Sequence, residues 1–134
     1  MAKLTAYMMS EDAKAQAAFY VQALGGEILS VVTHGQLPES NEELKDKVVN
    51  LSMTAAGITF LMSDSVFEPL RQGNAINLSL EYSNEAEARD AFDKLAVNGQ
   101  VIFPLEPAFW GALFGQIEDK FGIRWMITTT APQA

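Results

Sequence analysis

The sequence predicts an α+β fold made of two tandem βαβββ modules, because the chain repeats itself twice at related spacings. Residues 10–19 match residues 83–92 at an offset of 73, sharing one Ser, three Ala and one Phe. Residues 57–62 resemble residues 122–127 at an offset of 65. The third observation is the order of the apolar runs, which alternate with two alanine-rich segments in the same way in each half.

The alanine-rich segments are predicted to be helices. Each begins with capping-type and acidic residues, which suit the positive end of a helix, and each runs into glycine, at Gly25 and at Gly99. We therefore expect helices over about 11–24 and 84–98.

The remaining apolar runs are predicted to be strands. Asp119 and Gly122 have the chemistry of a tight turn between the last two. The two offsets differ by eight, so the first half has eight more residues than the second between its helix and its last strand. The polar stretch His34–Asp46 is where these extra residues fit. A ferredoxin-like βαββαβ fold would leave the strand pair after Pro107 unexplained. The expected strands are 3–9, 27–33, 48–54, 58–63, 75–82, 100–105, 110–118 and 123–129.

Composition indicates one domain, residues 1–134, built of modules at about 1–66 and 74–134. A chain of 134 residues with 49% hydrophobic content can bury one ordinary core.

The sequence has no long apolar run and no signal-peptide pattern, so we expect a cytoplasmic protein without a membrane partner. A net charge of −8 without a Lys/Arg cluster argues against nucleic acid.

The C-terminal hairpin carries a specific pattern of tryptophan and glycine: Trp110-Gly111, Phe114-Gly115, Asp119-Lys120-Phe121-Gly122 and Trp125-Met126-Ile127. It resembles the end of PhnB-like proteins of the vicinal oxygen chelate superfamily, which includes glyoxalase I, extradiol dioxygenases and bleomycin-resistance proteins. The resemblance implies two sheets curled around a shared cleft, with the helices outside, and a homodimer.

In metal-using members of that superfamily, the ligands are His or Gln on the first strand of each module and Glu on the last. The matching positions here are Thr5, Asn77, Leu61 and Met126. None is an ordinary ligand of a divalent metal, and the chain has one His and no Cys. We therefore expect no metal and no cofactor.

Strand side chains alternate between two faces, which divides the strand residues into two sets. One set is apolar and is assigned to the helix side: Leu4, Ala6, Met8, Phe60, Met62, Ile76, Leu78, Leu80, Trp125 and Ile127. The other set is mixed, as the wall of a small-molecule site usually is. Its predicted ligand-binding residues are Tyr7, Leu61, Asn77, Ser79, Glu81, Arg124 and Met126.

Two charged residues stand out in the mixed set. Arg124 would hold an anionic ligand group, and Glu81 would act as a base, unless the two are hydrated rim residues or pair with each other. His34 and Tyr7 are further acid–base candidates, although a lone loop histidine is usually a surface residue. Trp110 and Phe114 fit core or dimer contacts, or stacking on a planar ligand.

Two functions follow. The first is a metal-free homodimer that binds a small molecule, similar to the bleomycin-resistance branch. The alternative is a glyoxalase- or dioxygenase-like enzyme that uses an unrecognised metal set or a Glu/His/Tyr acid–base. The methyltransferase label often given to PhnB-like proteins is not supported, because the Gly25-Gly26 pair ends a helix rather than opening a nucleotide-binding turn.

Overall fold

The computed structural model describes residues 1–38 and 41–130, which form two compact units, Met1–Arg71 and Gln72–Ala134. We call them the N-terminal and C-terminal units. Their boundary falls between the predicted modules. That the two units make one domain stays a prediction. No helix in the described ranges is long and apolar enough to cross a membrane.

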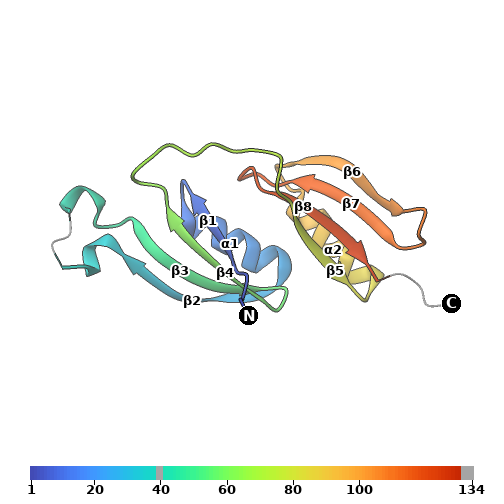
Figure 1. Ribbon diagram of the computed structural model, residues 1–134, viewed down its shortest axis with the longest axis horizontal. Helices are drawn as coiled ribbons and strands as arrows, with labels where there is room; N and C mark the ends of the chain where they lie inside the picture. Colours follow the sequence, from blue (N-terminus) through green and yellow to red (C-terminus); the bar gives the residue numbers. More distant parts are fainter. Residues whose placement is uncertain (39–40, 131–134) are drawn as a thin grey trace. The chain divides into compact units, whose positions relative to one another are not determined.

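The N-terminal unit is one four-stranded sheet with one helix (Figure 1). The strand order is β1-β4-β3-β2, with β1 parallel to β4 and the other neighbours antiparallel. Its elements are β1 (Ala6–Ser10), α1 (Ala13–Leu24), β2 (Gly26–Thr33), the 3₁₀ turns His34–Gln36 and Glu42–Leu44, β3 (Val48–Ala55) and β4 (Ile58–Asp64).

The C-terminal unit repeats this topology, with the strand order β5-β8-β7-β6. Its elements are β5 (Leu78–Tyr82), α2 (Glu85–Leu95), β6 (Gln100–Pro107), β7 (Leu113–Glu118) and β8 (Arg124–Thr129). The predicted tandem βαβββ fold is confirmed. The longer connection in the first module lies between Thr33 and Val48, where the sequence placed the excess, whereas the second module goes from Pro107 to Leu113.

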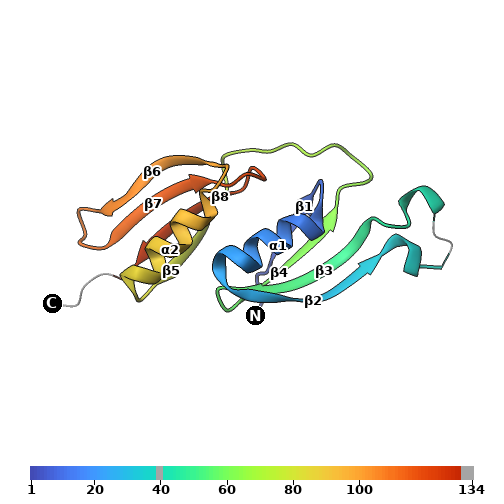
Figure 2. The same ribbon diagram turned by 180° about the vertical axis from the view of Figure 1, so that it is seen from behind.

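Each helix covers one face of its own sheet (Figure 2). The side chains of Asp12 and Asn84 cap the helices by accepting from the backbone N–H of Ala15 and Glu87, at 3.1 and 3.0 Å. Buried helix residues face the sheets: Ala13, Gln16, Ala17, Tyr20 and Ala23 from α1, and Ala88, Ala91, Phe92 and Leu95 from α2.

Close packing in the C-terminal unit depends on a glycine in β7. A Cβ at Gly115 would lie 2.7 Å from the ring of Phe92 and 2.9 Å from Cα of Leu105. Any larger residue would therefore push α2 away from the sheet or β6 away from β7.

Most of the predicted helix-side residues are buried: Met8, Phe60, Met62, Leu80, Trp125 and Ile127. Leu4 and Ile76 were assigned wrongly, since they are 98% and 82% exposed. The physical reason is that β1 begins only at Ala6 and β5 only at Leu78, so neither residue is paired with a neighbouring strand. The second helix also ends earlier than expected, at Leu95.

Candidate ligand-binding site

We call the side of each sheet opposite its helix the open face. On the N-terminal open face, one row of side chains runs across the strands as Tyr7, Leu61, Ser52 and Ser30. The Ser30 and Ser52 hydroxyls are 2.9 Å apart, and the Tyr7 hydroxyl donates to the Val49 carbonyl at 3.4 Å. This row carries no charged side chain.

The corresponding row of the C-terminal open face is Ser79, Met126, Gln116 and Phe103. Leu61 and Met126 occupy the same place in the two rows. The repeat offset of 65 therefore describes real structural equivalence at the centre of each sheet.

At one end of the C-terminal open face the side chains are polar. Arg124 Nε donates to Glu118 Oε1 at 3.2 Å, and the two side chains are 21% and 32% exposed. Beside them, Gln116 Nε2 donates to Asn77 Oδ1 at 2.7 Å. Arg124 thus pairs across the β7–β8 hairpin, and the suggested pairing of Arg124 with Glu81 is not the one observed.

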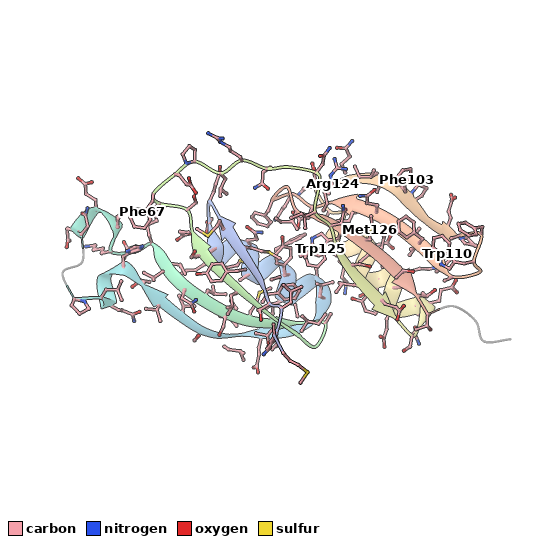
Figure 3. The ribbon with its side chains drawn as sticks, in the orientation of Figure 1. Phe67, Phe103, Trp110, Arg124, Trp125 and Met126 are labelled. Carbon is pink, nitrogen blue, oxygen red and sulfur yellow. The ribbon has the colours of Figure 1, made fainter. Side chains whose placement is uncertain are left out.

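At the other end the side chains are aromatic. The rings of Trp110 and Phe114 meet edge to face with centroids 6.0 Å apart. On the neighbouring strand β6, Glu106 is the cross-strand partner of Phe114, whereas Phe103 lies in the next row, opposite Gln116. Phe103, Trp110, Met126 and Arg124 can be followed in Figure 3. Along β8 the open face therefore changes from the Arg124–Glu118 ion pair to the aromatic rings of Trp110 and Phe114.

The predicted site residues divide between the two units. Tyr7 and Leu61 belong to the N-terminal unit, whereas Asn77, Ser79, Glu81, Arg124 and Met126 belong to the C-terminal unit. Asn77 lies just outside β5, and Ser79 and Glu81 are exposed.

His34 lies in the 3₁₀ turn after β2. Its ring meets Phe67 edge to face, with centroids 6.1 Å apart, and its backbone N–H donates to the Lys47 carbonyl at 2.8 Å. Among the described residues, these contacts hold His34 in place at the end of the β2–β3 hairpin.

The donor set at the matched metal positions does not fit a divalent metal. Leu61 and Met126 offer no oxygen or nitrogen, and the Asn77 carbonyl already accepts from Gln116. Within residues 1–38 and 41–130, no three His, Asp or Glu side chains are grouped so as to hold a metal ion.

Sequence reasoning missed Phe103, Glu106, Gln116 and Glu118 as residues of this face. Register irregularities at Val101/Phe103 and Phe103/Glu106 break the simple alternation of β6, so a strict two-residue period could not assign it. For β7, the period placed Phe114, Gln116 and Glu118 together, and this signal was available in the sequence.

These two sheets, with their repeated topology, correspond to a known family. The family model "Glyoxalase/Bleomycin resistance protein/Dioxygenase superfamily" matches residues 4–127. The chain belongs to this superfamily.

Three known proteins illustrate what the chain is similar to. Protein YjdN of Escherichia coli is 28% identical over 127 residues, covering 87% of this chain and 86% of its own. The crystal structure of PA1353 from Pseudomonas aeruginosa has a TM-score of 0.84 at 29% identity, covering 96% of this chain and 98% of that one. A PhnB protein from Bacillus cereus has a TM-score of 0.80 at 26% identity, with coverages of 96% and 100%.

Proposed function

We propose that this superfamily member binds a small organic molecule on the open face of its C-terminal sheet, without the metal site of the catalytic branches. The observation that carries the proposal is the ion pair of Arg124 with Glu118, set beside the apolar side chain of Met126. A mostly apolar wall with a few oriented polar groups is the usual composition of a small-molecule site.

Arg124 is the proposed anchor for an anionic group of the ligand. Its contact with Glu118 uses Nε, and among the described residues the terminal Nη groups form no hydrogen bond, so they can donate to a carboxylate or phosphate. Glu118 fixes the direction of the guanidinium, which lowers the entropy lost when a ligand binds. The neighbouring Gln116–Asn77 pair supplies further polar atoms at the same end.

The metal-free part of the proposal rests on the residues at the matched ligand positions. Thr5, Leu61, Asn77 and Met126 replace the His, Gln and Glu side chains of metal-using relatives, and Leu61 and Met126 cannot coordinate through oxygen or nitrogen. The proposal also includes a cytoplasmic homodimer that binds neither nucleic acid nor membrane, in keeping with the net charge of −8.

Native mass spectrometry of gently purified protein, combined with elemental analysis, tests this function. We expect a co-purified organic molecule and no stoichiometric metal. That molecule should be lost from Arg124→Met and retained by Arg89→Met. Arg89 is a matched control because it also forms an ion pair, with Glu85 at 3.3 Å, but on helix α2. About one zinc, nickel or iron per chain, or equal retention by both variants, would refute the proposal.

A further inference from the structure

The aromatic end of the C-terminal open face combines exposed rings with a carboxylate. Trp110 is 47% exposed and Phe103 55% exposed, although large aromatic side chains are normally among the most buried. The ring of Trp110 meets those of Phe114 and Phe109 edge to face, with centroids 6.0 and 4.8 Å apart. The rings therefore form one cluster with part of its surface open.

Acidic side chains border this cluster on the same face. Glu106 is paired with Phe114 across β6 and β7, and Glu81 and Phe114 both pair with Thr128. The row across the sheet is thus Glu81, Thr128, Phe114 and Glu106, with a carboxylate at each edge. Neither glutamate forms a salt bridge among the described residues.

Aromatic faces bordered by carboxylates attract organic cations. The electron-rich faces of Trp and Phe attract a cation within about 6 Å of the ring centre, and a neighbouring carboxylate adds direct charge attraction. A neutral or anionic group would gain nothing from Glu106.

We propose that Trp110 and Phe114, with Glu106 beside Phe114 and Phe103 in the next row of the sheet, bind an organic ammonium group of the ligand. The inference rests on the proposed function and specifies its ligand as a molecule with an anionic group for Arg124 and a cationic group for the aromatic end. The two ends are separated by the four residues from Arg124 to Thr128 on β8, about 13 Å at the usual rise of a strand.

The test uses choline as the probe and 3,3-dimethylbutan-1-ol, which has the same shape without the charge, as its control. The chain has two tryptophans, so a ¹H–¹⁵N spectrum contains two indole resonances. Trp110 is the exposed reporter, whereas Trp125 is fully buried and donates to Asp119 at 2.8 Å. We expect choline to shift the Trp110 resonance saturably at constant chloride, and the alcohol to bind at least about threefold more weakly.

Two charge-matched variants test the role of Glu106. Glu106→Gln should weaken choline binding about threefold. Glu87→Gln removes the same charge from helix α2, on the opposite side of the sheet, and should leave choline binding unchanged. The Trp125 resonance reports in each case that the C-terminal unit is folded.

Three results would overturn the inference. They are equal binding of choline and the alcohol, equal effects of the two glutamate variants, and a Trp110 resonance that responds to protein concentration instead of choline. The last would mean that a second copy of the chain covers the cluster. Arg124→Met should leave choline binding intact, so loss of the co-purified molecule from that variant tests the proposed function separately.

Discussion

Asp64 and Thr129 lie 65 residues apart and perform the same task in the two units. Asp64 Oδ2 accepts from the Val48 N–H at 2.7 Å, and Thr129 Oγ1 accepts from the Leu113 N–H at 2.9 Å. Val48 and Leu113 begin β3 and β7 and are themselves 65 residues apart. Asp64 has a second role, because its Oδ1 accepts from the Ala13 N–H at the start of α1, at 2.8 Å.

This difference predicts unequal losses of stability. Asp64→Ala should lower the free energy of unfolding by about 2–3 kcal/mol, because it leaves two backbone donors unpaired, one of them at a helix N-terminus. Thr129→Ala removes one neutral acceptor and should cost about 1 kcal/mol. Urea denaturation followed by circular dichroism measures both, and equal losses would mean that the contact with α1 contributes nothing.

Asp119 is predicted to be the most sensitive residue of the C-terminal hairpin. Its carboxylate is buried and accepts from the Phe121 and Ile123 N–H groups and from the indole of Trp125. Asp119→Ala should therefore cost about 3 kcal/mol or more. Lys120→Ala, an exposed change in the same turn that removes a cation–π contact with Phe121 at 5.4 Å, should cost less than about 1 kcal/mol in the same denaturation experiment. A mild effect of Asp119→Ala would show that water replaces these contacts.

Arg124 is predicted to matter for binding more than for stability. Arg124→Met should lower the affinity for an anionic ligand about a hundredfold or more, because one partner of a charge-assisted contact is lost. The unfolding free energy should fall by less than about 1 kcal/mol, because the ion pair with Glu118 is partly hydrated. Calorimetric titration and thermal denaturation measure the two quantities. Unchanged affinity together with a clear loss of stability would make Arg124 a purely structural partner.

Tyr82 should make the protein lose stability in alkaline solution. Burial, followed by the charges of Glu87 and Asp90, raises the pKa of its phenol above the ordinary value of 10.0. Above about pH 10 the unfolded chain releases this proton while the folded chain retains it, so the unfolding free energy falls as the pH rises.

Denaturation at several pH values between about 9 and 11 measures how the unfolding free energy depends on pH. Tyr82→Phe should remove the part of this pH dependence that is due to the phenol, and Glu87→Gln should make that part smaller. An unchanged slope in Tyr82→Phe would assign the alkaline instability to other groups.

The protein is expected to be a homodimer. This prediction rests on the arrangement expected from the superfamily, in which modules pair across a two-fold axis. Light scattering at micromolar concentration should give about twice the chain mass of 14.7 kDa. A mass near that of a single chain, unchanged on dilution, would contradict it.

The sequence by itself determined the repeat, and the repeat determined the fold. Helix starts, glycine stops and apolar strand runs act over short distances, so capping-type residues near each helix start and turns such as Asp119–Gly122 could be identified from neighbouring residues alone. The alternation of faces was equally reliable wherever the strands are regular, as for Phe60, Met62, Trp125 and Ile127.

Tertiary structure decided where the strands begin and which side chains meet. Leu4 and Ile76 continue the apolar pattern but lie before the first paired residues of β1 and β5. Strand ends depend on the partner strand and not on local preference. The pairing of Arg124 with Glu118 and the position of Glu106 opposite Phe114 depend on strand register. Bulges set that register in β6, and no two-residue period reveals a bulge, which is why only the folded chain showed that Phe103 and Glu106 lie opposite Gln116 and Phe114.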